Sequence, residues 1–247
     1  MKIKVINPNT TWTMTDKIAG AARAAAAPGT EIVAVSPDMG PVSIEGYYDE
    51  VFAAVGVVDE VRKGELEGCD GYVIACFGDP GLNAAREVAR GPVIGIAEAA
   101  MHAASLIGGS FSIISMLGRS RGVLEHLVHS YGMAHKCRSV RMTDLPVLEF
   151  EEEGSDARRI VVEECRRAIE QDHADSVLLG CGGMSDLMAY VSQEIGAPAI
   201  DGVSAGVKLV EALVGMGLGT SKRAGLRLSD RESLHCSFSS FAPSRPR

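Results

Sequence analysis

The stretch VIACFGDP, from Val73 to Pro80, leads an apolar run into a glycine-bearing turn and places Cys76 at the junction. The stretch VLLGCGGM, from Val177 to Met184, repeats this arrangement with Cys181. Short runs rich in valine, isoleucine and leucine that end in turn residues are typical of buried strands. The two stretches therefore predict two similar strands, each of which ends in a cysteine.

Runs of the same kind alternate with longer alanine-rich stretches of helical period along the whole chain. This alternation is the pattern of parallel strands joined by crossover helices, so the sequence predicts an α/β protein. The expected strands are Lys2 to Asn7, Glu31 to Val35, Tyr72 to Cys76, Val93 to Ile96, Phe111 to Ser115, Ser139 to Met142, Ser176 to Gly180 and Ala199 to Asp201.

The expected strands form two series in the same order. The run KIKVIN at Lys2 corresponds to FSIISM at Phe111, Cys76 corresponds to Cys181, and each landmark recurs about 105 to 109 residues later. We therefore predict two pseudo-symmetric lobes, each a roughly four-stranded parallel sheet flanked by helices. The expected divisions are residues 1–98 for the first lobe, 99–205 for the second, and 206–247 for a C-terminal helix that returns to the first lobe and a frayed tail.

The composition is that of an ordinary globular protein, with 46% apolar residues over 247 positions. Lysine and arginine number 24 against 32 acidic residues, and the net charge of -8 leaves no broad basic surface for nucleic acid or anionic lipid. The start, MKIKVINPNT, lacks the apolar stretch of a signal peptide, and no later run has the length of a membrane span. We expect a cytoplasmic protein without nucleic-acid or membrane partners.

Six cysteines occur in the chain, and no two are spaced as Cys-x-x-Cys. A reducing cytoplasm would keep them as thiols, so neither a zinc site nor a dithiol redox motif is expected. Cys69, Cys137 and Cys165 are interpreted as packing or surface residues. Cys236 lies in a tail rich in serine, proline and arginine that we expect to be frayed.

Ligands of open α/β sheets bind beyond the carboxyl ends of the strands. Two lobes related by duplication would share a cleft there, with Cys76 and Cys181 opposite one another across it. We expect a helix N-terminus beside each thiol. The Asp79-Pro80 pair is a good helix start, and Ser185 or Asp186 can cap the helix that follows the second cysteine. Such a terminus favours the thiolate.

Two facing thiols are suited to inverting a stereocentre beside a carbonyl group. One sulfur, as thiolate, removes a proton from one face of the carbon, while the other, as thiol, delivers a proton to the opposite face. Either enantiomer can be the substrate if the two sulfurs exchange roles. Near-attack distances place the sulfurs about 7 Å apart with the carbon between them, too far apart for a disulfide.

The residues alone leave other interpretations open. A cysteine at a strand end is often a small buried hydrophobe. A lyase such as a decarboxylase would need only Cys181, and a non-catalytic two-lobe binding protein would need neither thiol. Glu45 or Asp79 could serve as a carboxylate base, although Asp79 is first interpreted as a helix cap.

Several further polar residues receive structural interpretations. His126 and His129 fit a solvated helix face better than a metal site, which would need a third ligand. We expect His102 to pack near the junction of the lobes and Glu151 to Gly154 to form a charged loop. The triplet Asn9-Thr10-Thr11 matches a glycosylation site but lacks a secretion signal.

Six segments spread along the chain carry a family resemblance. They are INPNT from Ile6, SIEGYYDE from Ser43, ACFGDPG from Ala75, PVIGIAEAAMH from Pro92, LGCGGM from Leu179 and IDGVSAGVK from Ile200. Together they resemble the aspartate/glutamate racemase superfamily and, within it, the hydantoin racemase and allantoin racemase group. The resemblance implies two pseudo-symmetric α/β lobes, a homo-oligomer, no metal, no pyridoxal phosphate or other cofactor, and proton exchange at C5 of a hydantoin ring.

The resemblance also implies roles for particular residues. Cys76 and Cys181 would be the acid/base thiols, and the backbone amides after each of them would hold the ring. The residues that would contact the ring or its substituent are Asn9, Ser43, Ile44, Phe77, Gly78, Ser115, Gly182 and Gly183. Members of the group often have two threonines where this chain has Ser115-Met116. FGDPG combined with GCGGM is closer to the allantoin type, which slightly favours allantoin among 5-substituted hydantoins.

Overall fold

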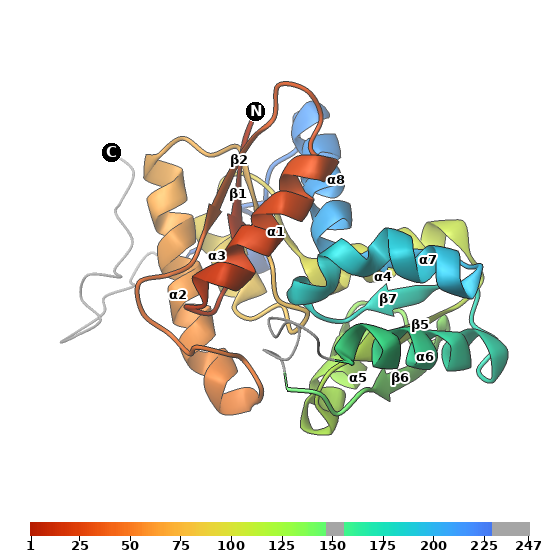
Figure 1. The fold of residues 1–247 in the computed structure, drawn as a ribbon. Coiled ribbons are helices and arrows are strands. Elements are labelled where there is room, and N and C mark those ends of the chain that lie inside the picture. Colours follow the sequence, from red (N-terminus) through yellow and green to blue (C-terminus); the bar gives the residue numbers. More distant parts are fainter. Residues whose placement is uncertain (147–155, 229–247) are drawn as a thin grey trace.

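Two four-stranded parallel sheets form the centre of the computed structural model, which describes residues 1–146 and 156–228 (Figure 1). The first sheet has the order β2-β1-β3-β4, and the second has the order β6-β5-β7-β8. The strands are β1 (Lys2–Ile6), β2 (Glu31–Val35), β3 (Gly71–Ile74), β4 (Val93–Gly95), β5 (Phe111–Ser115), β6 (Cys137–Met142), β7 (Val177–Leu179) and β8 (Ala199–Asp201).

The matching strand orders confirm the predicted α/β fold with two similar lobes. All eight expected strands are present, and β2, β5 and β8 have the predicted bounds, whereas the ends of the other strands differ from the prediction. β3 ends at Ile74 rather than at Cys76, and β6 begins at Cys137 rather than at Ser139. The predicted lobe boundary at residue 98 falls inside a helix, and the division into lobes stays a prediction.

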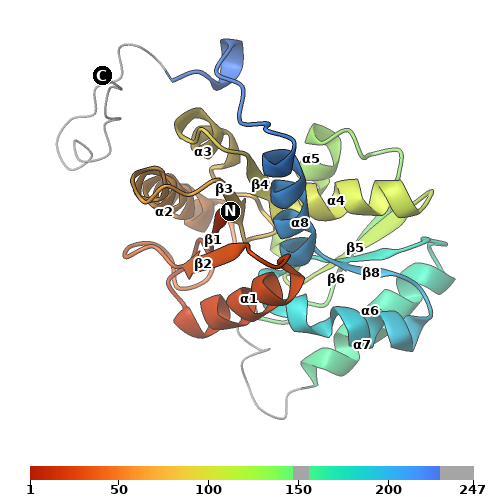
Figure 2. The same ribbon diagram turned by 90° about the horizontal axis from the view of Figure 1, so that it is seen from above.

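Helices cover both faces of each sheet. They are α1 (Trp12–Ala25), α2 (Tyr47–Leu66), α3 (Leu82–Val88), α4 (Ile96–Ile107), α5 (Arg121–Ser130), α6 (Ala157–Glu170), α7 (Met188–Ile195) and α8 (Gly202–Gly215), with 3₁₀ turns η1 (Gly118–Ser120), η3 (Gly182–Leu187) and η4 (Ala224–Leu226). In the first lobe α1 and α8 share one face and α2 and α3 share the other (Figure 2). No helix in residues 1–146 and 156–228 is long and apolar enough to cross a membrane.

The core is continuous between the lobes. One cluster of buried side chains includes Val5 and Val73 of the first sheet, Phe111 and Leu178 of the second, and Val207 of α8. α8 packs against α1, β3 and β4, so the chain returns to the first lobe after it has completed the second. The central strands β3 and β5 are buried along their whole length, which explains why their sequences, GYVI and FSIIS, contain no charged residue.

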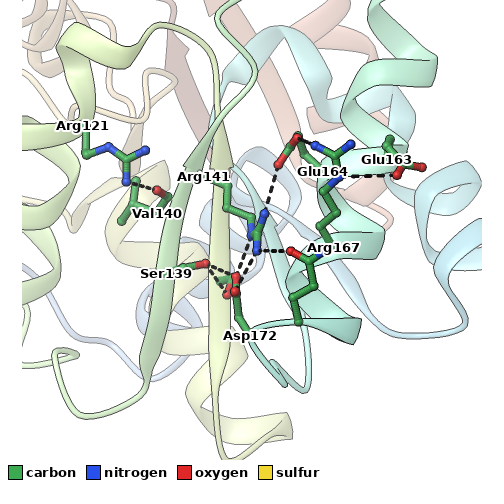
Figure 3. A network of polar contacts seen from close by, with 10 residues as sticks. Arg121, Ser139, Val140, Arg141, Glu163, Glu164, Arg167 and Asp172 are labelled. Carbon is green, nitrogen blue, oxygen red and sulfur yellow. Dashed lines mark hydrogen bonds and ion pairs between the residues drawn. The ribbon is translucent and has the colours of Figure 1, made fainter.

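The edge strand β6 is fixed to α6 by a polar network (Figure 3). Asp172, just after α6, accepts hydrogen bonds from Arg141 Nε at 2.6 Å and from Arg141 Nη2 at 2.7 Å. It also accepts one from Ser139 Oγ at 2.5 Å. These hydrogen bonds, those from Arg141 first among them, lower the pKa of Asp172. The network stabilises an edge strand that is otherwise only partly covered.

We expect Asp172→Asn to lower the free energy of unfolding by about 1–3 kcal/mol at pH 7, because one oxygen of a bidentate pair is lost. The lowered pKa means that this stabilisation is present above the unfolded-state pKa of about 4 and is lost as pH falls through the folded-state value. Urea unfolding at pH 7 and at acidic pH measures the difference. The exposed Asp156–Arg159 pair provides a control, since Asp156→Asn should not move the midpoint. A difference for Asp172→Asn that stays constant at acidic pH would contradict this interpretation.

Candidate active site

A cleft of about 720 Å³, including the part that opens to solvent, lies between the lobes at the carboxyl ends of the strands. Both lobes contribute to its walls. The lining residues are Asn7, Asn9, Met14, Ile44, Glu45, Gly46, Glu50, Ala75, Cys76, Phe77, Gly78, Ser115, Met116, Leu117, Ser120, Val123, Leu124, Gly180, Cys181 and Gly182. Most of the predicted site residues therefore lie in one cleft, although they come from segments about a hundred positions apart in the sequence.

The two cysteines occupy equivalent positions in the two lobes. Cys76 lies two residues beyond the end of β3, and Cys181 lies two residues beyond the end of β7. Both are partly exposed and line the same cleft. The loops that carry them are in contact, because a Cβ atom added at Gly182 would lie 2.8 Å from the backbone oxygen of Ala75. The structure therefore presents two thiols from opposite walls to one cavity.

The environment of Cys76 keeps its thiol protonated. Burial, together with smaller contributions from the nearby Cys181, Asp79 and Glu50, raises the pKa of Cys76 to about 12. A backbone hydrogen bond from Gly78 acts in the opposite direction but is the smaller effect. The expectation that a helix terminus would favour the thiolate at this position is wrong, because desolvation outweighs the amide dipoles.

The local structure around the thiols also differs from the expected helix starts. α3 begins only at Leu82, and Gly81, with φ of 72°, precedes it without a side-chain cap. Asp79 does cap a helix, but the helix is α4: its carboxylate accepts hydrogen bonds from the amides of Ala97 and Glu98. The expectation that Asp79 caps the helix that directly follows it is therefore wrong, because Asp79 caps α4 instead.

In the second lobe a 3₁₀ turn, η3, begins directly after Cys181. The hydroxyl of Ser185 does not cap α7, which starts after Leu187 without a side-chain cap. It donates instead to Asp201 Oδ1 at 2.6 Å. Asp201 in turn caps α8, a role that the sequence interpretation did not assign.

The predicted substrate-binding residues divide into two groups. Asn9, Ile44, Phe77, Gly78, Ser115 and Gly182 line the cleft, whereas Ser43 and Gly183 are not among its lining residues. The Ser43 hydroxyl donates to Glu45 Oε1 at 3.1 Å. Gly183 still lies close to the second thiol, because a Cβ atom there would be 3.7 Å from Cys181 Sγ. Their roles toward a substrate stay predictions.

Two of the polar lining residues already have protein partners. The amide oxygen of Asn9 accepts from Asn7 Nδ2 at 2.8 Å and from the amide of Thr11 at 2.9 Å. The hydroxyl of Ser115 donates to the backbone oxygen of Gly180 at 2.9 Å. These bonds fix the ends of β1 and β5 at the cleft, which orients the side chains before any ligand binds.

Sequence reasoning missed Glu50, which enters the cleft from the first turns of α2. Its Oε1 would lie 2.9 Å from a Cβ atom added at Gly78, so it sits beside the loop of the first thiol. Burial, with help from Asp49, raises its pKa. Glu45, which was weighed as a base, is engaged in an ion pair of 2.5 Å with Arg119. Glu50 lies in the quoted segment SIEGYYDE, but nothing in that segment showed which of its acidic side chains would face the cleft.

The remaining polar candidates lie outside the cleft. His102 is exposed, which corrects the expectation that it packs between the lobes, and its Nδ1 donates to the backbone oxygen of Glu98 at 2.8 Å. His126 and His129 are exposed on α5. Within residues 1–146 and 156–228, no group of three or more His, Cys, Asp or Glu side chains is arranged to hold a metal ion. Glu151 to Gly154 and Cys236 lie outside the described residues.

A sequence model of the Asp/Glu/Hydantoin racemase family matches residues 3–210. The chain belongs to the Asp/Glu/Hydantoin racemase family. It is 51% identical to the hydantoin racemase of Pseudomonas sp. (strain NS671), over 90% of this chain and 89% of that protein. Among solved structures, the allantoin racemase from Klebsiella pneumoniae is 51% identical with a TM-score of 0.97, covering 99% of this chain and 100% of that chain.

A second solved structure, the allantoin racemase of Pseudomonas fluorescens, is 36% identical with a TM-score of 0.92, covering 96% of this chain and 100% of that chain. As a member of the Asp/Glu/Hydantoin racemase family, the protein is an isomerase of the racemase class. The lyase and the non-catalytic binding protein, which the residues alone left open, are thereby set aside.

Proposed function

We propose that this racemase inverts C5 of a 5-substituted hydantoin by proton transfer between Cys76 and Cys181. One observation carries the proposal: the two thiols follow equivalent strands of two equivalent lobes and line the same cleft. A mechanism with a single base gives no reason for a second thiol at the matching position. A mechanism with two bases requires it, because the proton leaves one face of the ring carbon and returns to the other.

In the proposed reaction the thiolate of one cysteine takes the C5 proton and becomes a thiol. The electron pair of the C–H bond moves toward the C4 carbonyl oxygen and forms an enolate. The other cysteine then donates its proton to the opposite face of C5 and becomes the thiolate. The enzyme is left with the roles of the two thiols exchanged, ready for the other enantiomer, and no cofactor takes part.

Backbone amides of the two cysteine loops are the proposed partners of the ring oxygens. Phe77 and Gly182 line the cleft, and Gly182 has no side chain that could cover its amide, whereas the Gly78 amide already hydrogen-bonds to Cys76. Preorganised amide donors aimed at a developing enolate oxygen stabilise the charge without reorganisation during the reaction. The buried setting that raises the pKa of Cys76 also makes its thiolate a strong base once it forms.

Allantoin is the hydantoin that we favour as substrate. Its C5 substituent is a ureido group with several N–H donors, and Glu45, Glu50 and Ser120 provide acceptors in the cleft beside the apolar Val123 and Leu124. A substrate that leaves buried polar groups of the site unpaired is discriminated against more strongly than one that only lacks a methylene group. We further propose that the protein is cytoplasmic and, as the family resemblance suggests, homo-oligomeric.

We expect kcat/KM for racemisation of allantoin to exceed that for 5-benzylhydantoin by at least about tenfold, which corresponds to one unmet hydrogen bond. Loss of optical rotation from one enantiomer of each compound, corrected for the rate without enzyme, provides the measurement. Glu50→Gln should lower the ratio of kcat/KM for allantoin to kcat/KM for benzylhydantoin. Glu87→Gln, a change outside the cleft, should leave this ratio unchanged. A preference for benzylhydantoin would reject the choice of allantoin and leave the hydantoin class standing.

A further inference from the structure

Each cysteine loop is fixed to the N-terminus of a helix by a buried carboxylate. In the first lobe, Asp79 accepts from the amides of Ala97 at 3.1 Å and Glu98 at 3.0 Å, at the start of α4. In the second lobe, Asp201 accepts from the amides of Val203 at 3.0 Å and Ser204 at 2.8 Å, at the start of α8. Both helices follow the last strand of their own sheet.

The two lobes supply this carboxylate from different places. Asp201 is paired in the sheet with Leu179, two residues before Cys181, and the matching position in the first lobe is Gly95, paired with Ile74. Gly95 has no carboxylate, so the cap comes from Asp79, three residues after the first cysteine.

A Cβ atom added at Gly95 would lie 2.1 Å from Asp79 Cγ, so the glycine makes room for the carboxylate. In the second lobe the loop of Cys181 contacts the cap through a hydroxyl, that of Ser185, which donates to Asp201 at 2.6 Å. The loop of Cys76 is therefore bound directly by its own carboxylate. The loop of Cys181 is bound through a serine.

Asp79 also reaches the other lobe. Its Oδ2 accepts from Tyr131 Oη at 2.7 Å, and Tyr131 follows α5 of the second lobe. The Asp79 side chain is 5% exposed, and its backbone has φ of 47°, a conformation that non-glycine residues rarely adopt. The other charged groups nearby are Glu98 of α4 and Arg86 of α3, which pair with each other at 2.5 Å.

Burial and hydrogen bonding act in opposite directions on the pKa of this carboxylate. Burial raises the pKa of Asp79 to about 7, and the hydrogen bonds from Tyr131 and from the two amides hold it from rising further. These three donors require acceptors, which the ionised carboxylate provides. A buried donor without an acceptor is unfavourable, so loss of the carboxylate would displace the loop of Cys76.

We propose that Asp79 is a positioning residue that sets the loop of Cys76 against the second lobe, and hence against Cys181, through α4 and Tyr131. Asp79 does not line the cleft, so it acts through the thiol and not on the substrate. The proposal rests on the two-thiol function proposed above. It explains the difference between the lobes. The first lobe has an aspartate in the cysteine loop and a glycine at the end of its last strand, whereas the second has a serine and an aspartate at these places.

The test uses Asp79→Asn, which keeps the shape of the side chain but replaces one carboxylate oxygen with an NH₂ group. At least one of the three hydrogen-bond donors around residue 79 then faces another donor instead of an acceptor. We expect kcat for racemisation per folded molecule to fall about 10- to 100-fold, as a misplacement of about 1 Å does, with KM changed less than about threefold. Deuterium exchange at C5 without inversion should persist for the enantiomer whose hydrogen faces Cys181. The ratio of exchange to inversion therefore rises for that enantiomer.

A loss of stability alone would lower exchange and inversion together, so the ratio separates positioning from folding. Glu60→Gln is the matched control, because Glu60 is another buried carboxylate, 5% exposed and paired with Lys4 at 3.1 Å, and it does not line the cleft. It should lower the urea midpoint and leave the ratio unchanged. If Asp79→Asn does not fold, Tyr131→Phe, which removes one hydrogen bond, should raise the ratio in the same direction.

A swap variant tests the comparison between the lobes. The backbone of Gly95, with φ of −83° and ψ of 148°, resembles that of Asp201, with φ of −90° and ψ of 125°. Asp79→Ser combined with Gly95→Asp should therefore restore kcat relative to Asp79→Ser alone. A wild-type ratio and kcat in both Asp79→Asn and Tyr131→Phe would overturn the proposal. Full activity of Cys76→Ser or Cys181→Ser, measured beside them, would instead overturn the two-thiol function.

Discussion

Replacement of either cleft cysteine by serine should lower kcat for racemisation by at least about 1000-fold. A serine hydroxyl is too weak an acid to be ionised near neutral pH, so the general base or the general acid of one half-reaction is lost. The two variants should lose activity to a similar degree. Each direction of the reaction uses both sulfurs, one to remove the proton and one to return it. Polarimetry on a single enantiomer measures the loss.

Cys69→Ser is the control for this pair of variants. Cys69 is partly exposed and packs against the buried cluster that includes Tyr72 and Val93, and it does not line the cleft. It should keep the wild-type rate. Retention of activity within threefold by Cys76→Ser or by Cys181→Ser would refute the two-base proposal, whatever the substrate.

The second large effect concerns the reactivity of Cys76. Because burial raises its pKa to about 12, alkylation of Cys76 by iodoacetamide should increase tenfold per pH unit from about pH 8 to pH 10 in the ligand-free protein. Over the same range the rate of an ordinary thiol, with a pKa of about 8.5, levels off. At pH 9 the fraction of thiolate is then about 1000-fold below full ionisation. Mass spectrometry of the peptide that contains Cys76 gives the rate.

Limited access to the cleft lowers the absolute rate at every pH but not the shape of the profile, so the shape is the diagnostic quantity. A small free thiol in the same mixture provides the reference. In Cys181→Ser the profile should shift to lower pH, since one contribution to the raised pKa comes from the charge of Cys181. A Cys76 profile that levels off below pH 9 would show that desolvation does not control this thiol.

The repeat in the sequence was sufficient to predict the fold. Apolar runs such as GYVI and FSIIS are buried on both faces, and a run of that kind has few alternatives to a central parallel strand. The equivalent positions of the two cysteines followed from the same repeat. The strand ends were less accurate, because the backbone leaves the sheet before Cys76 while the side chains remain apolar.

The features that sequence did not predict depend on contacts between distant segments. Asp79 looked like the start of the helix after it, yet its partners are amides of α4 and a tyrosine of the other lobe. Glu50 and His102 lie on helices whose faces could not be oriented without the packing of the neighbouring elements. Local dipoles suggested an acidic thiol at Cys76, whereas its pKa is set by burial, a property of the folded cleft.

If two thiols act on opposite faces of one carbon, deuterium exchange at C5 in D₂O distinguishes their separate roles. Each pure enantiomer is incubated with wild type, Cys76→Ser and Cys181→Ser, and proton NMR and optical rotation are followed together. We expect exchange with inversion in the wild type. In the variants we expect complementary behaviour, in which each exchanges only the enantiomer whose hydrogen faces its remaining thiol, without inverting it. Exchange of the same enantiomer by both variants, or inversion by either, would contradict the account.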